Sequence, residues 1–128
     1  MKSENKTAAA PRKGAKAKGL KKVEAFVRPG ALKKIMLALA EADYPGLTVT
    51  EVQGHGRQRG VKEHYRDQTT MSLLTKFKLE IVVEGGDEAR RIVDAIVKAA
   101  RTGEYGDGKI FVYDVERALR IRTGEPVV

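Results

Sequence analysis

The sequence predicts an α+β fold over residues 21–128, with helices on one face of an antiparallel sheet. Three observations predict it. An internal repeat gives residues 22–54 and 78–116 the same layout of alternating stretch, glycine-containing break, helical pattern, second break and second alternating stretch. Apolar residues occupy every second position in the first stretch of each copy, which is typical of a half-buried strand. Between the breaks they recur every three to four residues, as on an amphipathic helix.

Each predicted element rests on a short set of apolar residues. Those of the strands are Val23, Ala25, Val27, Phe77, Leu79, Ile81 and Val83. Those of the helices are Leu32, Ile35, Met36, Leu39, Ala89, Ile92, Val93, Ile96 and Val97. Asp87 follows two glycines and is predicted to cap the second helix.

Two βαβ units in tandem give the order β-α-β-β-α-β. Their crossovers should be right-handed, which places both helices on one face of a four-stranded sheet in the ferredoxin-like plan. The other face has no helix over it, yet it carries Val82, Phe111, Tyr113 and Val115. Because this face is too apolar for solvent, we expect further copies of the chain to cover it.

Composition limits the class of protein. The chain has 128 residues, of which 41% are hydrophobic, and it contains no Cys and no Trp. It can therefore build a core but no disulfide and no thiolate metal site. No apolar run reaches the roughly 20 residues of a membrane-spanning helix, and no signal-peptide core follows the first basic residues. We expect a small cytoplasmic protein that does not insert into membranes.

The net charge of +8 is concentrated at the N-terminus. Residues 1–22 hold eight of the 25 basic side chains and one of the 17 acidic ones, so the remainder is nearly neutral. Residues 1–20 are rich in Ala, Lys and Gly and cannot bury enough surface to offset the entropy of ordering, so we expect a disordered basic arm. Such an arm either binds nucleic acid or anionic membranes or is a solvated extension.

The connection from about residue 54 to residue 75 separates the two copies of the repeat. It begins with GHGRQRG and shows no helical or strand periodicity. A connection of this length inside a compact domain argues for a functional loop.

Three separate pieces of the chain are compatible with phosphate. Residues 103–109 fit G-x-x-x-x-G-K, but Ile110 follows and a strand comes next, so the segment is not a P-loop. A glycine-rich turn followed by Lys109 can still bind phosphate, or it is an ordinary hairpin turn. Arg120 and Arg122 should lie on one side of an extended chain, around an anion or beside local acidic partners. Arg57 adds a third cation at the base of the long loop. Together the pieces favour a polyanionic small molecule such as a nucleotide.

Enzyme classes find little support. His55 and His64 are the only histidines, and neither belongs to a helical metal-binding pattern. Neither Ser3 nor Ser72 stands in a G-x-S-x-G setting. The carboxylates are scattered, with no evident acid–base pair. We therefore expect a binding module and not an enzyme.

The order of these motifs resembles the PII signal-transduction family over roughly residues 21–125. The segments that carry the resemblance are KVEAFVRP, LTVTEVQGHGRQRG, EHYRD, KFKLEIVV, AARTGEYGDGKIFVYDVE and RIRTGE. The resemblance implies a homotrimer that takes part in nitrogen regulation and binds ATP or ADP in clefts between subunits. The long connection would be the T-loop, which docks on a transporter or an enzyme.

The resemblance also assigns residues to the nucleotide. They are Thr48, Gly54, Gly56, Arg57, Gln58, Glu80, Val82, Gly106, Gly108, Lys109, Arg120 and Arg122. Thr48, Glu80 and Val82 would line the adenine and ribose. Arg120 and Arg122 would reach in from the neighbouring subunit, and the others would hold the phosphates.

A second ligand is implied with Mg-ATP. Gln58 would coordinate the magnesium, and Lys76 would pair with a carboxylate of 2-oxoglutarate, with Arg28 nearby. Bicarbonate is the alternative small anion. The tyrosine that some relatives modify falls at Thr69 or Thr70 here, while Tyr65 matches an earlier tyrosine of the loop, so no modification is expected.

A nucleic-acid-binding ferredoxin-like module is the alternative function. The basic arm would supply charge, and Phe111 and Tyr113 would stack on bases. Only 5% of the residues are aromatic, and the body of the chain is nearly neutral, so the nucleotide sensor is favoured.

Overall fold

The computed structural model describes residues 19–55, 62–65, 68–71 and 73–127. Nearly all of the predicted arm lies outside the described residues, and Leu20, its last residue, already belongs to a strand. In chain order the elements are β1 (Leu20–Val27), the 3-10 turn η1 (Pro29–Ala31), α2 (Leu32–Glu41), β2 (Thr48–Gly54), β3 (Lys62–Tyr65), β4 (Gln68–Met71), β5 (Leu74–Glu84), α3 (Gly86–Ala100) and β6 (Lys109–Asp114).

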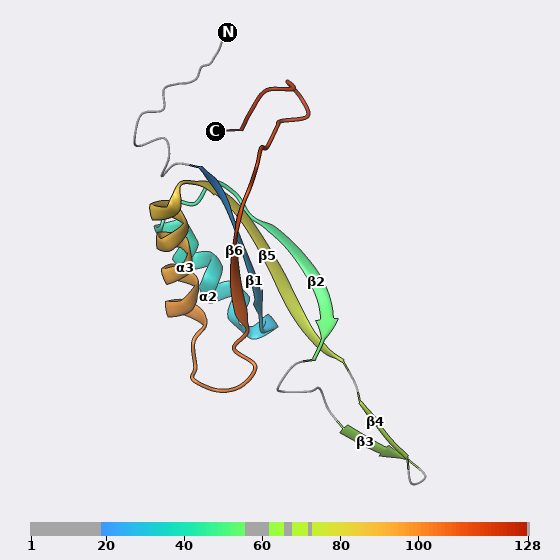
Figure 1. Ribbon diagram of the computed structural model, residues 1–128. Helices are drawn as coiled ribbons and strands as arrows, with labels where there is room; N and C mark the ends of the chain where they lie inside the picture. The colour runs from blue at the N-terminus through green and yellow to red at the C-terminus, as the bar shows by residue number, and fades with distance from the viewer. Residues whose placement is uncertain (1–18, 56–61, 66–67, 72, 128) are drawn as a thin grey trace.

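The main sheet confirms the predicted ferredoxin-like α+β fold. Its strands are ordered β2-β5-β1-β6, and every neighbouring pair is antiparallel. Both helices lie on one face of this sheet (Figure 1). The two central strands come from different copies of the repeat, so each copy depends on the other for its sheet.

The core lies between the helices and this face of the sheet. Its strand residues alternate as the sequence predicts: Val23, Ala25 and Val27 are buried, and so are Leu79, Ile81 and Val83 across the β1–β5 pairing. The helices contribute Ile35, Leu39, Ala89, Ile92 and Ile96. Burying one large aliphatic side chain contributes about 1.5–3 kcal/mol, so this layer is the main source of stability. The helical positions Met36 and Val97 are instead 42% and 41% exposed.

The start of α3 differs from the sequence prediction. Gly85 occupies the cap position with φ 94°, and no side chain caps the helix. Asp87 lies inside the first turn, next to Glu88. The prediction of Asp87 as the cap was therefore wrong, because glycine alone adopts this backbone conformation easily. The carboxylates still favour the helix N-terminus through its dipole.

The face without helices is a mixture of apolar and charged groups. Phe111 and Tyr113 are 44% and 45% exposed there. The Tyr113 hydroxyl donates a hydrogen bond of 2.8 Å to Glu24, and Lys22 binds Glu80 at 3.1 Å while its ammonium lies 5.0 Å from the Tyr113 ring centre. The face is thus less uniformly apolar than its sequence pattern suggests, and its coverage by other copies stays a prediction.

The long connection contains structure that the sequence did not reveal. β2 continues to Gly54 and β5 begins at Leu74, so the ends of the predicted loop belong to the main sheet. Within it β3 and β4 form an antiparallel pair with Tyr65 opposite Gln68, and this pair projects away from the sheet (Figure 1). The absence of a periodic apolar pattern therefore did not exclude strands here, and the role of the connection as a functional loop stays a prediction.

The segment after β6 is also more compact than predicted. The N–H of Gly124 bonds to the carbonyl of Arg120 at 2.7 Å, and Leu119 bridges to Pro126. Arg120 and Arg122 therefore belong to a closed turn and not to an extended chain. Glycine allows the turn, since Gly124 has φ 73°.

Candidate functional site

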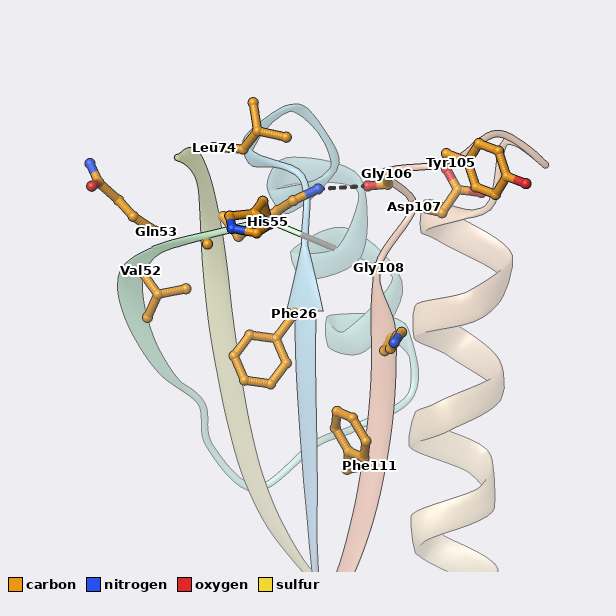
Figure 2. A pocket seen from close by; sticks show the side chains of 13 residues that line it. Phe26, Val52, Gln53, His55, Leu74, Tyr105, Gly106, Asp107, Gly108 and Phe111 are labelled. Carbon is orange, nitrogen blue, oxygen red and sulfur yellow. Dashed lines mark hydrogen bonds between the residues drawn. The ribbon is translucent and has the colours of Figure 1, made fainter. Parts of the chain in front are cut away.

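A pocket of about 480 Å³ lies at one end of the sheet. The end of β1, the end of β2, the start of β5 and the loop between α3 and β6 meet there (Figure 2). Its lining residues are Phe26, Val52, Gln53, Gly54, His55, Leu74, Lys76, Tyr105, Gly106, Asp107, Gly108, Lys109 and Phe111.

The pocket brings together five residues that the sequence assigned to ligand binding. They are Gly54, Lys76, Gly106, Gly108 and Lys109. They come from three distant parts of the chain, and the antiparallel order of the sheet places these parts at one end. The predicted glycine-rich turn and the base of the long loop thus form a single site.

The loop from residue 101 to residue 108 depends on glycines. Gly103, Gly106 and Gly108 have φ of 89°, 102° and 105°, a region that other residues rarely adopt. At Gly108 a Cβ atom would lie 1.8 Å from the carbonyl oxygen of Phe26. The loop therefore approaches β1 as closely as it does only because residue 108 has no side chain.

One carboxylate organises the same loop. Asp107 accepts hydrogen bonds of 2.8 Å from the backbone N–H groups of Thr102 and Gly103, and a further bond from the Thr102 hydroxyl. The hydroxyl contact contributes most to lowering the pKa of Asp107 to about 2, and the two N–H groups and the charge of Arg28 act in the same direction. The side chain is therefore an anion at physiological pH.

Lys76 joins the base of the long loop to the glycine-rich loop. Its ammonium donates a hydrogen bond of 3.0 Å to the carbonyl of Gly106 (Figure 2). Burial lowers the pKa of Lys76, and the charge of Arg28 lowers it further, whereas Asp107 acts in the opposite direction. An anion in the pocket would compensate both the burial and the repulsion.

The pocket suits a ligand with an anionic part and a flat apolar part. Lys76 and Lys109 provide two ammonium groups at the glycine-rich loop. Within the described part of the chain, the N–H groups of Tyr105 and Gly106 have no acceptor, and unpaired N–H groups in such turns bind anions. Deeper along the open face, the rings of Phe26 and Phe111 meet edge to face, with their centres 6.2 Å apart.

The structure places the other predicted nucleotide residues elsewhere. Thr48 and Glu80 are opposite each other on β2 and β5, and Val82 follows on β5, toward the far end of the sheet. The segment after β6, which contains Arg120 and Arg122, lies at the end of the sheet opposite the pocket (Figure 1). None of these five residues lines the pocket of the same chain.

Two further predicted groups have different outcomes. Arg28 donates a hydrogen bond of 2.9 Å to the carbonyl of Ala100, and its Nε lies 3.6 Å from Asp107, so it holds the loop from behind and does not line the pocket. Gly56, Arg57 and Gln58 lie outside the described residues. Their roles stay predictions.

Sequence reasoning missed several residues of the pocket. Phe26 lies on the strand face opposite the core, and the strand register pairs it with Lys109; the alternation around Val23 and Ala25 could have revealed this. Asp107 and Tyr105 stand inside a predicted turn, where the motif drew attention only to the glycines and the lysine. His55 was considered as a metal ligand and not as part of a pocket wall.

The residues that the structure describes contain no group of three or more His, Asp or Glu side chains able to hold a metal ion. Likewise, no helix in the described ranges is long and apolar enough to cross a membrane.

Fold and pocket together define a small α+β protein whose pocket brings two lysines next to a glycine-rich loop. The model of the family "Nitrogen regulatory protein P-II" matches residues 20–125, and the chain belongs to this family. It is 52% identical over 107 residues to the nitrogen regulatory protein P-II of Microchaete diplosiphon and 51% identical to that of Synechocystis sp.. The P-II 1 protein of Escherichia coli K12 is 50% identical. Each comparison covers 83% of this chain and 95% of the relative.

Membership of this family gives the chain a role in signal transduction. It agrees with the expectation of a signalling protein. The resemblance seen in the motifs of the sequence is thereby confirmed.

Proposed function

We propose that the chain is a cytoplasmic PII-type sensor that binds ATP or ADP in the pocket and reports its occupancy through the T-loop. The observation that carries this proposal is the convergence of Lys76, Lys109 and the glycine-rich loop beside the Phe26–Phe111 pair. The ammonium and N–H groups suit phosphates. The aromatic pair offers an apolar wall for the base.

The complete site needs a homotrimer. The segment after β6 lies at the end of the sheet opposite the pocket of its own chain (Figure 1), so its residues Arg120 and Arg122 would reach a nucleotide only in a neighbouring subunit. Thr48, Glu80 and Val82 lie on the open face of the sheet, where they would line the adenine and ribose across the same interface. The exposed rings of Phe111 and Tyr113 support an assembly that covers this face.

A second effector would bind beside the phosphates. Gln58 would hold magnesium with ATP, and the Lys76 ammonium would pair with a carboxylate of 2-oxoglutarate. Bicarbonate is the alternative effector. Arg28 would contribute through its charge. The T-loop would then dock on a transporter or an enzyme, because a projecting hairpin with few contacts to the sheet is easily biased by a ligand at its base.

Calorimetry with ATP and ADP tests nucleotide binding. Wild-type protein should bind both, and Lys109→Ala should weaken binding by about tenfold or more, since a charge-assisted contact to phosphate is lost. Lys98→Ala is the matched control, because Lys98 is exposed on α3 and lies outside the pocket. Absence of binding by the wild type would refute the proposal.

Mixed trimers test the shared site. Lys109→Ala and Arg122→Ala chains should each bind ATP poorly alone, since each alters every site of a homotrimer. Co-refolding the two should restore some sites, where an intact Lys109 faces an intact Arg122. No recovery in mixed trimers, with recovery expected in a wild-type mixture, would contradict a site shared between subunits.

The second effector can be identified by thermal shift. Protein with Mg-ATP should gain further stability from 2-oxoglutarate, or from bicarbonate if that is the anion, because ligands of the native state stabilise it by mass action. Lys76→Ala should remove the additional shift.

A further inference from the structure

The glycine-rich loop is held in shape by polar contacts at both of its ends. At its start, Thr102 and Gly103 bind the carboxylate of Asp107. The Thr102 hydroxyl also accepts a hydrogen bond of 3.2 Å from the N–H of Glu104. One carboxylate and one hydroxyl thus close the loop on itself.

Arg28 ties this closed loop to the rest of the molecule. One end of its guanidinium bonds to the carbonyl of Ala100, the last residue of α3, and its Nε faces Asp107 at 3.6 Å. The Nε is buried and has no hydrogen-bond partner among the described residues. The guanidinium therefore bridges the end of α3 and the loop carboxylate from the end of β1.

This arrangement solves an electrostatic problem of the pocket. Asp107 lines the pocket, and an ionised carboxylate there would repel a phosphate chain. Its oxygens are instead occupied by three donors from Thr102 and Gly103, and the charge of Arg28 opposes its own. The carboxylate can therefore shape the loop without presenting its charge to the ligand.

The position of Asp107 in the chain explains why its fixation matters. It stands between Gly106 and Gly108 and next but one to Lys109, the residues with the groups suited to phosphate. Two neighbouring glycines with positive φ leave this stretch little intrinsic rigidity. Anchoring the Asp107 side chain restricts the backbone on either side of it.

We propose that Asp107 is a positioning residue for the phosphate part of the ligand, with Thr102 and Arg28 holding it in place. The inference rests on the nucleotide-binding function proposed above. Asp107 itself makes no contact with phosphate. It keeps the glycine-rich loop in the conformation that binds phosphate, so its loss should affect any polyphosphate ligand to the same degree, whether or not a base is attached.

The test compares ATP with inorganic tripolyphosphate, both as competitors of a fluorescent ATP analogue on the full chain. Asp107→Asn keeps the size of the side chain but loses its charge and one acceptor. It should lower the affinity for ATP and for tripolyphosphate by a similar factor, about tenfold or more. Asp114→Asn is the control: Asp114 pairs with Lys21 at the other end of β6, and this variant should bind like the wild type.

A second pair of variants keeps the test decisive if Asp107→Asn folds poorly. Thr102→Val removes the hydroxyl that binds Asp107 and should weaken both competitors severalfold, whereas Thr102→Ser retains the hydroxyl and should restore wild-type affinity. Circular dichroism and thermal unfolding identify variants that are folded. A generally destabilising role would not produce recovery by the serine variant.

The outcomes separate this inference from the proposed function. If the wild type does not bind the ATP analogue, both fail. If the wild type binds and the folded Asp107→Asn and Thr102→Val variants bind equally well, only the positioning role is overturned. The positioning role is also overturned if the variants bind ATP more weakly but tripolyphosphate as well as before. The same holds if tripolyphosphate does not displace the ATP analogue from the wild type. In both cases the loop would not act through phosphate.

Discussion

The two helix-to-strand connections of the internal repeat occupy equivalent places and are built in opposite ways. After α2, residues 42–47 are anchored by apolar groups: Ala42, Tyr44 and Leu47 pack against the core. After α3, residues 101–108 are anchored by Asp107, Thr102 and Arg28, and Tyr105, the large apolar side chain of this loop, is 73% exposed.

The difference shows how one supersecondary unit can serve stability in one copy and binding in the other. A connection whose large side chains point inward adds to the core, but its backbone does not line a binding site. A connection held by side-chain hydrogen bonds can present glycine backbone at a pocket. Function is thus located in one loop and not in the repeated plan.

Alanine at Gly108 should have the largest effect on this contrast. The Cβ would meet the Phe26 carbonyl oxygen at 1.8 Å, and φ is 105°. Strained backbone and a forced shift of the loop should lower the free energy of unfolding by about 3 kcal/mol. Urea denaturation of the variant and the wild type measures this change in the free energy of unfolding.

Gly46→Ala, in the first connection, is the matched control. A Cβ there would have open space and φ is not positive, so the change should stay within about 0.5 kcal/mol. Equal losses for the two glycine variants would show that the close approach at Gly108 is not required.

Leu47→Ala should separate stability from binding. The partly buried side chain packs on the core, and its truncation should cost about 2 kcal/mol. The folded fraction should bind ATP with unchanged affinity, since Leu47 is absent from the pocket lining. Calorimetry below the melting temperature checks this, and a large loss of affinity would contradict the division between the two connections.

The acid dependence of stability should reflect Asp107. Its folded-state pKa is about 2, against an ordinary value of 3.8, so its contribution is fully present above about pH 4 and is lost as the pH falls toward 2. In denaturation series over this range, Asp107→Asn should decline less steeply than the wild type. Parallel declines would indicate that the carboxylate is not held by its donors in solution.

Tyr105→Ala should have the smallest effect on folding. Because the side chain is 73% exposed, the free energy of unfolding should change by no more than about 0.5 kcal/mol. Thermal unfolding against Tyr44→Ala, which removes a ring packed on the core, tests the comparison directly. The Tyr44 variant should be the less stable of the two.

The sequence predicted the fold well because its strongest patterns are local. Val23, Ala25 and Val27 repeat with the period of a strand, and Ile92 and Ile96 with that of a helix, so composition along a short window was enough. The glycines and Lys109 of the second connection were recognised for the same reason.

Other features depend on contacts that no short window contains. Arg28 meets Asp107 only after β1 and the end of α3 come together, which a linear motif cannot reveal. The turn around Arg120 is closed by a glycine and by the bridge from Leu119 to Pro126, so the prediction of an extended chain was wrong. Similarly, the cap of α3 is Gly85 and not Asp87, because the cap position requires a positive φ, which glycine adopts more easily than aspartate.

The hydrogen bond from Lys76 to Gly106 has a mechanical consequence. Lys76 lies two residues from the start of β5, opposite Val52 near the end of β2, where the two strands release the chain that carries β3 and β4. An anion that binds this ammonium would weaken the hydrogen bond between the base of the β3–β4 hairpin and the glycine-rich loop. The hairpin could then respond to the contents of the pocket without ever touching them.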